Sequence, residues 1–142
     1  MIAQPLVGTD DAEYTVGAFG DGHGGVAASI TFRRVLAADG STGKGWVEKV
    51  ASLEAVVARL AQRFKPRGPT NLQFRRDGEE WELLEINPRI SSSTSIRTAF
   101  GYNESVMCVD YYLNGRLPDQ PTISTGFAVR YVEDMIVYER GS

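Results

Sequence analysis

The sequence predicts an α+β fold, in which a mostly antiparallel sheet has two to three helices packed on one side. Three pairs of alternating segments read as hairpins, and three other stretches read as helices or helical turns. The chain has 142 residues, 42% of them hydrophobic, which suits an ordinary globular domain. We therefore expect residues 1–142 to form a single domain.

The first predicted hairpin joins residues 13–19 to residues 26–36. A run of turn residues, GDGHGG, separates these two segments of strand character. The run lacks the Gly-Lys-Ser/Thr ending of a phosphate-binding loop and no helix follows it, so it predicts a turn. His23, the only histidine, lies in this turn without a nearby serine or cysteine nucleophile. It is therefore not a catalytic candidate.

The clearest predicted helix covers residues 52–64. Ser52 is the expected N-cap, and Pro66 and Gly68 end the helix. The apolar residues of this segment recur at helical spacing and form one stripe: Leu53, Val56, Val57, Leu60 and Phe64. This stripe is expected to face the sheet.

The remaining predicted elements are shorter. Residues 46–49 read as a short strand, and residues 104–113 read as a helix with Cys108 on its apolar side. Residues 126–132 and 135–138 read as a closing hairpin. These elements complete the predicted sheet and its helical layer.

A second hairpin is expected between residues 71–75 and 80–87, with its turn at Asp77-Gly78. A three-residue loop, residues 76–78, would put Gly78 in the left-handed conformation that glycine adopts most readily. A two-residue loop is the alternative. The choice matters because a shift of one residue moves every side chain to the other face.

The register of this hairpin decides which polar side chains share a face. With the three-residue loop, Gln73 pairs with Trp81, and the side chain of Gln73 then lies on the face of Glu85 and Asn87. A two-residue loop would turn Gln73 away. The first register is favoured because it gathers four apolar residues on the opposite face: Leu72, Phe74, Leu84 and Ile86.

One face of the predicted hairpin thus carries one carboxylate and two amides, with Arg89 just beyond its end. Hard cations such as Mg²⁺ prefer oxygen ligands and keep places for phosphate oxygens and water. A single carboxylate with amide oxygens suits Mg-ATP, because the triphosphate supplies much of the negative charge. Arg89 offers a planar fork of donors to a phosphoryl oxygen. The alternative is a solvated polar face that binds nothing.

Composition argues against several other classes of partner and location. The net charge of −3 is too mild to indicate a nucleic-acid or membrane-surface partner. The sequence has no run of 18 apolar residues, and its start lacks the basic and apolar regions of a signal peptide. Its single cysteine cannot form an internal disulfide, so a cytoplasmic location is expected.

The run LEINPR at residues 84–89 resembles a motif in the C-terminal part of an ATP-grasp domain. NLQF precedes it at residues 71–74, and SSTS follows at residues 92–95. The sequence is most similar to the version in the large subunit of carbamoyl-phosphate synthetase and related carboxylate ligases. The resemblance covers nearly the whole chain, and it implies the fold of the ATP-grasp C-terminal subdomain.

The resemblance also implies roles for the residues of the hairpin. Gln73, Glu85 and Asn87 match the positions that hold two magnesium ions in the family, with Glu85 as the bridge. Arg89 matches the arginine that stabilises the transferred phosphoryl group, which makes it the catalytic candidate. ATP and Mg²⁺ are therefore the expected cofactors.

Contacts with adenine and ribose are implied elsewhere in the chain. Gln4 and Leu6 match the hinge whose backbone pairs with the adenine edge, and Glu13 matches the acidic residue that holds the ribose hydroxyls. Leu84 matches an apolar residue under the adenine. Strict alternation puts Leu84 on the far face, so a twist or bulge would be required there.

Other basic residues lie where the family places phosphate contacts. Arg33, Arg34 and the loop of residues 41–44, with Lys44, occupy these positions, although their residue types differ from those of the synthetases. A solvated strand end is the alternative for Arg33 and Arg34. For Arg97, a surface position and a contact with the acceptor carboxylate or phosphate both stay open.

A complete ATP-grasp enzyme has a preceding domain and a lid subdomain, and ATP lies between two subdomains. The resemblance begins almost at the hinge, so we expect the C-terminal portion alone, as part of an ATP-dependent carboxylate or bicarbonate ligase with an acyl-phosphate intermediate. Its expected partners are ATP, an unknown carboxylate, and a separate chain or second copy that supplies the missing half. The alternative is a non-catalytic nucleotide- or partner-binding fragment, inactive alone and dimeric.

Overall fold

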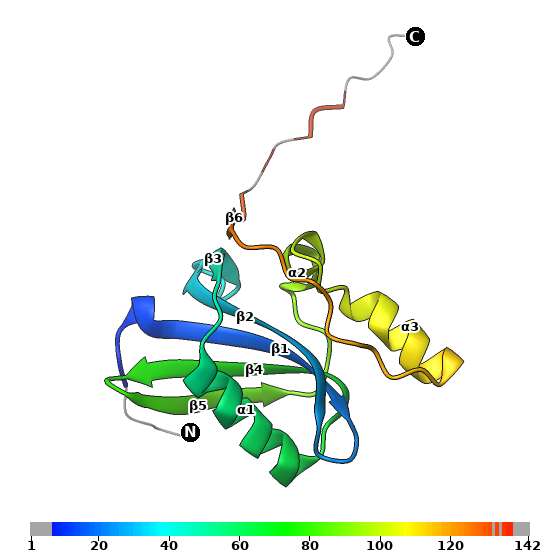
Figure 1. Ribbon diagram of the computed structural model, residues 1–142. Helices are drawn as coiled ribbons and strands as arrows, with labels where there is room; N and C mark the ends of the chain where they lie inside the picture. Colours follow the sequence, from blue (N-terminus) through cyan, green and yellow to red (C-terminus); the bar gives the residue numbers. More distant parts are fainter. Residues whose placement is uncertain (1–6, 132, 134, 138–142) are drawn as a thin grey trace, which may run out of the picture.

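A computed structural model describes residues 7–131, 133 and 135–137 of the chain. Its centre is a six-stranded antiparallel sheet in the order β5-β4-β1-β2-β3-β6 (Figure 1). The strands are β1 (Glu13–Asp21), β2 (Val26–Leu36), β3 (Thr42–Val47), β4 (Arg67–Asp77), β5 (Glu80–Asn87) and β6 (Phe127–Val129). The helices are the 3₁₀-helix η1 (Asp10–Ala12) and the α-helices α1 (Ala51–Phe64), α2 (Thr94–Ala99) and α3 (Glu104–Asn114). The predicted α+β class with an antiparallel sheet is confirmed.

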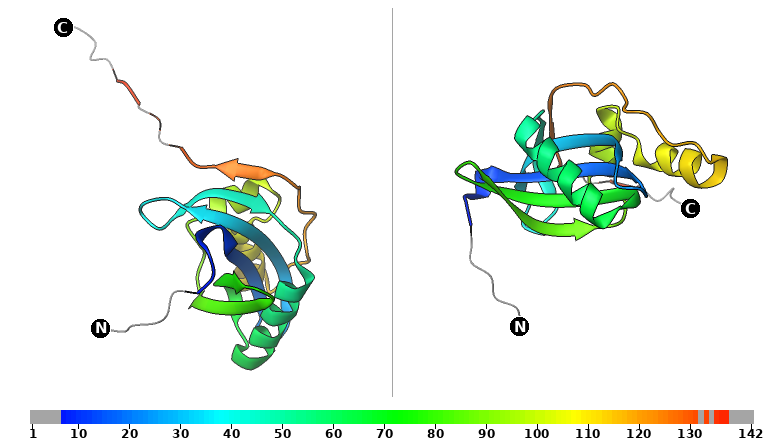
Figure 2. Two further views of the ribbon diagram at one scale, coloured as in Figure 1. Left: turned by 90° about the vertical axis from the view of Figure 1, so that its left-hand side faces the viewer. Right: turned by 60° about the horizontal axis from the view of Figure 1, so that its bottom comes forward.

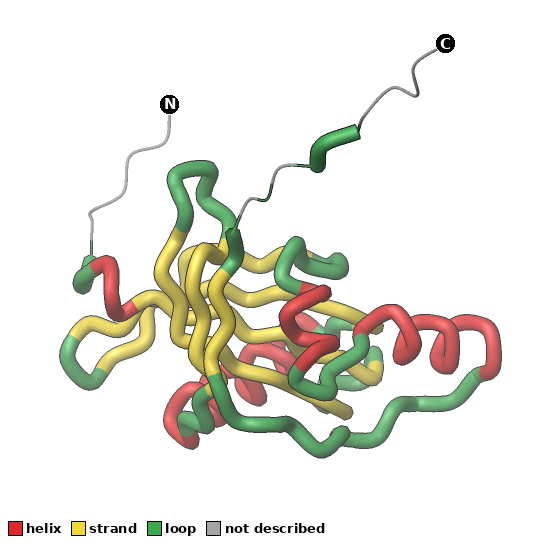
Figure 3. The backbone as a smooth tube through the Cα atoms, turned by 90° about the horizontal axis from the view of Figure 1, so that it is seen from above, coloured by secondary structure: helices red, strands yellow, loops and turns green. Residues whose placement is uncertain are grey.

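The helices divide between the two faces of the sheet instead of sharing one side (Figures 2 and 3). One face, called the α1 face, packs on α1 through a core that includes Tyr14, Val16 and Leu72. The other, called the α3 face, packs on α2 and α3 through a core that includes Phe19 and Ile30. Neighbouring strand residues point to opposite faces, so two apolar sets on the same strands require a helical layer on each side.

Helix α1 covers its face of the sheet with the predicted apolar stripe. Leu53 and Val57 are buried, whereas Phe64 at the end of the helix is exposed. The predicted cap is wrong: Val50 holds the N-cap position, and the Ser52 hydroxyl accepts a hydrogen bond from the Trp81 indole N–H at 3.0 Å. The helix therefore starts one residue earlier than its sequence signal indicates.

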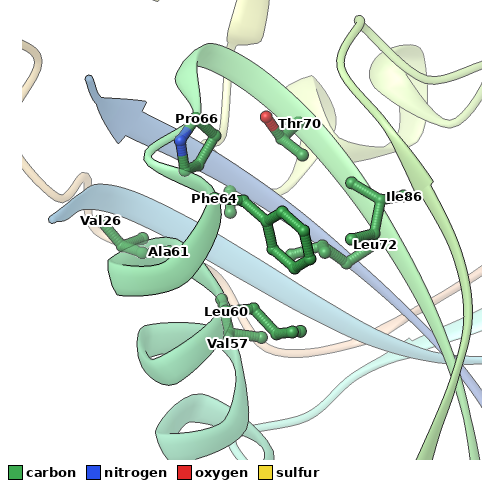
Figure 4. A pocket seen from close by; sticks show the side chains of 10 residues that line it. Val26, Val57, Leu60, Ala61, Phe64, Pro66, Thr70, Leu72 and Ile86 are labelled. Atoms are coloured by element: carbon green, nitrogen blue, oxygen red, sulfur yellow. The ribbon is translucent and has the colours of Figure 1, made fainter. Parts of the chain in front are cut away.

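A small hollow remains between α1 and the sheet (Figure 4). Its lining is apolar except for the Thr70 hydroxyl, and it includes Leu60, Phe64, Leu72 and Ile86. Because no charged side chain lines it, this hollow does not have the chemistry of a phosphate site.

The β4–β5 hairpin differs from its predicted register. Asp77 pairs with Glu80, so the turn has two residues and the predicted three-residue loop is wrong, although Gly78 does take a positive φ of 59°. A β-bulge then leaves Leu84 unpaired, and Gln73 faces Glu85 across the ladder. The bulge reverses the shift that a two-residue turn alone would cause, and Gln73 returns to the predicted face.

The predicted closing hairpin is not formed by the described residues. Residues 127–129 pair with β3, while residues 135–137 are outside any strand; Val132 and Tyr138 lie outside the described residues. An edge strand offers unpaired backbone groups, and β3 provides such an edge. The strand predicted at 46–49 correspondingly begins earlier, at Thr42.

No helix formed by the described residues is long and apolar enough to cross a membrane.

Candidate functional site

A row of hydrogen-bonded polar side chains crosses the α3 face near one end of the sheet. Arg34 Nη2 donates to Glu13 Oε1 and to Gln73 Oε1, each at 2.6 Å. Gln73 Nε2 donates to Glu85 Oε2 at 2.6 Å, and Arg75 Nη2 donates to Glu13 Oε2 at 2.9 Å. Strands β2, β1, β4 and β5 each contribute to this set, which we call the polar row.

The polar row runs from the interior to solvent. Glu13 and Arg34 are buried, Gln73 is half-buried and Glu85 is exposed. Antiparallel pairing explains the assembly, because Glu13 pairs with Arg34 on one side and with Arg75 on the other. The exposed end is the part of the row that a ligand can reach.

The three predicted metal ligands share this face. Asn87 follows Glu85 by two residues on β5, and its side-chain Nδ2 is buried without a hydrogen-bond partner among the described residues. Arg89 lies just beyond β5 and is exposed; its side-chain hydrogen bond in the described structure goes to the Ile90 carbonyl at 3.2 Å. The structure therefore brings Gln73, Glu85 and Asn87 together and leaves the guanidinium of Arg89 accessible beside them.

Two predicted phosphate contacts lie on the opposite face. Arg33 bonds to Glu48 Oε1 at 2.8 Å and lies over the Trp46 ring, 4.5 Å from its centroid. Lys44 is two residues from Trp46 on β3, so alternation places it on the same α1 face. The structure does not bring Arg33 and Lys44 to the polar row; Arg34, the neighbour of Arg33, holds that place.

The predicted adenine and ribose contacts have mixed outcomes. Gln4 and Leu6 lie outside the described residues. Leu84 lies in the bulge that its predicted role required, and its contact with adenine stays a prediction. Both carboxylate oxygens of Glu13 already accept hydrogen bonds from arginines, so contact with ribose hydroxyls would require Glu13 to exchange a partner.

Two arginines at the site were not singled out from the sequence. Arg75 joins the row because β4 pairs it with Glu13, a pairing that alternation alone does not specify. Arg130 follows β6, and its guanidinium donates to the Ser92 carbonyl at 2.9 Å. Arg130 reaches the loop after Arg89 only through long-range pairing of β6 with β3, which no local signal predicts.

Arg97 has neither of its two predicted positions. It is completely buried, and Nη1 donates to the buried Glu104 Oε1 at 2.8 Å. Burial lowers the pKa of the Arg97 guanidinium, and the Glu104 carboxylate opposes this shift. A group this deep cannot contact an acceptor substrate.

The polar row is open to solvent at its Glu85 end. A second hollow of about 510 Å³ lies between β2, the start of α1 and residues 120–125. Neither this hollow nor the one under α1, as the described residues line them, includes Gln73, Glu85 or Asn87. A ligand on the polar row would therefore contact this chain from one side.

Comparison with known families gives one match, which covers most of the chain. The model of the family described as "ATP-grasp in the biosynthetic pathway with Ter operon" matches residues 2–135. A comparison with curated proteins finds no match. The ATP-grasp resemblance is confirmed, and the finer similarity to carbamoyl-phosphate synthetase stays a prediction.

Several solved structures share the fold of this chain. N5-carboxyaminoimidazole ribonucleotide synthetase from Thermus thermophilus is 19% identical with a TM-score of 0.59, over 84% of this chain and 34% of that one. Urea carboxylase from Kluyveromyces lactis is 18% identical with a TM-score of 0.62, over 81% and 11%. Biotin carboxylase from Campylobacter jejuni, solved as a β-γ-ATP complex, is 14% identical with a TM-score of 0.59, over 86% and 29%.

These identities show a shared fold, and the chain spans between 11% and 34% of the length of those three structures. The family match is the stronger finding because it extends over almost the whole sequence. The chain belongs to the family of ATP-grasp proteins in the biosynthetic pathway with Ter operon.

Proposed function

We propose that this chain is the magnesium- and ATP-binding portion of an ATP-dependent carboxylate or bicarbonate ligase that works through an acyl phosphate. The observation that carries the proposal is the Gln73–Glu85 pair, hydrogen-bonded at 2.6 Å on the face that Asn87 and Arg89 extend. Membership in the ATP-grasp family supports it.

The donor set fits magnesium. Glu85 supplies an exposed carboxylate, and Gln73 and Asn87 supply amide oxygens on the same face, which is the all-oxygen set that Mg²⁺ prefers. Asn87 Nδ2 has no hydrogen-bond partner among the described residues, so no hydrogen bond from this nitrogen fixes the amide in its present orientation. When bound, two magnesium ions would neutralise phosphate charge. Glu85 would bridge them, with Gln73 and Asn87 as further ligands.

The arginines have separate roles in this proposal. The Gln73 oxygen now accepts from Arg34 Nη2, so use of that oxygen by a cation would release one Nη2 N–H for a phosphate oxygen while the bonds from Arg34 to Glu13 remain. Arg89 donates to the phosphoryl group as it is transferred, and Glu13 binds the ribose hydroxyls. Charge stabilisation and positioning are the protein's contribution, because phosphoryl transfer to a carboxylate needs no covalent nucleophile from this chain.

The second wall of the site must come from elsewhere, because ATP on the open polar row would be enclosed from one side only. We propose that residues 1–142 are the C-terminal portion of an ATP-grasp domain. The other wall of the ATP site is then supplied by a further part of a longer chain, by a separate subunit or by a second copy of this chain. The small share of each solved structure that this chain covers supports this view.

Calorimetry with ATP, with and without magnesium, tests the proposal. We expect magnesium to strengthen ATP binding to the wild type, and Glu85→Ala to abolish that dependence. Glu80→Ala is the matched control, because it removes an exposed carboxylate from the same strand away from the polar row. An ATP affinity that is the same with and without magnesium, and the same in wild type and Glu85→Ala, would overturn the proposal.

A non-catalytic nucleotide- or partner-binding module is the second candidate. It is favoured by the hydrogen bonds within the polar row, because Arg34 already donates to the side-chain oxygens of Glu13 and Gln73. The two functions separate in a turnover assay. A ligase releases ADP as it phosphorylates the carboxylate, and phosphate as a nucleophile then attacks the acyl phosphate, when its second wall, a carboxylate and that nucleophile are supplied. A binding module retains ATP unchanged.

A further inference from the structure

Arg97 lies between the α3 face of the sheet and the helices that cover it. It fills the space above Gly17, which has no side chain of its own. It comes from α2, the helix that follows the loop of Arg89, and it is completely buried. A Cβ added to Gly17 of β1 would lie 2.7 Å from Arg97 Nη1 and 2.8 Å from Cζ. The guanidinium therefore occupies the space above Gly17, and no larger residue fits there without displacing it.

The guanidinium joins three elements. Its Nη1 donates to Glu104 Oε1 of α3 at 2.8 Å, and its Nη2 donates to Asn71 Oδ1 of β4 at 2.6 Å and Thr15 Oγ1 of β1 at 3.1 Å. Thr15 Oγ1 itself donates to Asn71 Oδ1 at 2.8 Å. We call these four residues, Arg97, Glu104, Asn71 and Thr15, the buried polar cluster. All four are essentially inaccessible to solvent.

The two acceptors of Nη2 are ladder neighbours of the proposed metal ligands. Asn71 pairs with Asn87 across β4 and β5, and Thr15 pairs with Gln73 across β1 and β4. Paired residues of antiparallel strands have side chains on the same face at close distance. The buried polar cluster thus stands directly beside two of the three ligands on the same face of the sheet.

The geometry of the buried polar cluster is better suited to orient side chains than to stabilise the fold. A planar guanidinium has donors in fixed directions, and here these directions fix both the Asn71 amide and the Thr15 hydroxyl. Buried ion pairs contribute little net stability compared with apolar packing, so such a pair can serve to specify one arrangement. Arg97 therefore orients the side chains of Asn71 and Thr15 in the ladder. It also fixes how α2, and with it the loop of Arg89, packs on the sheet.

We propose that Arg97 is a positioning residue for the magnesium site, which acts through Asn71 and Thr15 on Asn87 and Gln73. This inference rests on the proposed function. It assigns a specific role to the interior of the molecule, because partners of metal ligands tune affinity for the metal without touching it.

The test uses Mn²⁺ as a probe in place of Mg²⁺, with ATP binding and the electron paramagnetic resonance spectrum of bound Mn²⁺ as readouts. Arg97→Lys keeps the charge opposite Glu104 but lacks the planar fork. We expect it to raise the Mn²⁺ concentration for half-maximal binding about tenfold and to alter the spectrum. The affinity for metal-free ATP should stay unchanged, which a general loss of structure would not allow.

A second variant guards against misfolding of the first. Arg97→Met with Glu104→Leu replaces both buried charges by apolar side chains and is expected to fold, yet to show the same loss of metal affinity. The matched control is the exposed pair Arg116 and Asp110, changed to Ala together, which should leave the Mn²⁺ dependence as in the wild type.

The outcomes separate the two proposals. Wild-type Mn²⁺ dependence in folded Arg97→Lys or in the double variant would overturn the positioning role and leave the proposed function standing. Absence of metal-dependent ATP binding in the wild type would overturn the proposed function and the positioning role with it.

Discussion

Two groups of arginines, carboxylates and amides lie side by side on the α3 face, and they differ mainly in burial. The polar row ends at Glu85, which is exposed, whereas the buried polar cluster holds Arg97 and Glu104 at 0% exposure. Both contain an arginine that donates to a carboxylate and to an amide oxygen, Arg34 in the row and Arg97 in the cluster. The same chemistry therefore appears twice, once completely buried and once in a row whose far end, at Gln73 and Glu85, reaches solvent.

The difference in burial changes what each group can do. Buried charges lack water as an alternative partner, so a lost partner is costly and the arrangement is fixed. At the exposed end of the row, water can replace any partner, so Gln73 and Glu85 can exchange hydrogen bonds for a ligand at low cost. The buried polar cluster is therefore suited to hold geometry, and the polar row is suited to bind.

Removal of one carboxylate from each group should have the largest contrast. Glu104→Ala leaves Arg97 buried without its counter-ion and is expected to lower the free energy of unfolding by about 3–5 kcal/mol. Glu85→Ala at the exposed end should change it by no more than about 0.5 kcal/mol. Urea unfolding followed by circular dichroism measures the free energy of unfolding of both variants. Equal losses of stability would contradict the distinction between the polar row and the buried polar cluster.

Arg89→Ala should show the next largest effect, on turnover. Loss of a donor that stabilises charge in the transition state costs about 10²- to 10³-fold in kcat. ATP affinity should be nearly unchanged, because the exposed Arg89 bonds only to the Ile90 carbonyl among the described residues. ADP release by the complete enzyme, with calorimetry of ATP binding alongside, checks this; a weakened affinity with unchanged kcat would assign Arg89 to ground-state binding instead.

The neighbouring residues Arg33 and Arg34 offer a smaller but cleaner contrast. Arg34→Lys is expected to weaken Mg-ATP binding about tenfold, since a hydrogen bond to a charged group contributes about 1.5–3 kcal/mol. Arg33→Lys and Lys44→Ala should leave it unchanged, because both side chains lie on the α1 face. Titration calorimetry decides the matter. A loss of affinity in Lys44→Ala would show that the nucleotide reaches the other face.

Local sequence signals predicted the elements but not their alignment. Alternation and the glycine-rich turn predict the β1–β2 hairpin, and both features are contained within one short segment. The register of β4–β5 is different, because it contains a bulge at Leu84 that alternation alone does not specify. The shared face of Gln73 and Glu85 was predicted correctly through a turn that was wrong.

Long-range contacts explain what the sequence could not indicate about the site. The burial of Arg97 depends on the absence of a side chain at Gly17 and on the ion pair with Glu104. The arrival of Arg130 depends on β6 joining β3 instead of folding back on residues 135–137. The contacts with Gly17 and between β6 and β3 join segments that are distant in sequence, where periodicity and capping signals carry no information.

The smallest expected effect concerns Asp21, a half-buried carboxylate at the end of β1 that belongs to neither group. Its Oδ1 accepts hydrogen bonds from the backbone N–H groups of His23 at 2.6 Å and Gly25 at 2.9 Å. These bonds lower the pKa of Asp21 below its ordinary value. Its stabilisation is therefore present above the unfolded-state pKa of about 3.9 and disappears as the pH falls through the lower folded-state pKa.

Asp21→Asn should consequently lower Tm slightly at pH 7 and leave it equal to that of the wild type at strongly acidic pH. Thermal unfolding across the acid range measures the difference between the two proteins. A difference that grows on acidification would mean that the folded-state pKa is raised, contrary to the two donors at this carboxylate. A small, acid-sensitive loss would show how little a solvated carboxylate adds to stability even when well bonded. It would therefore agree with the small loss of stability expected for Glu85→Ala.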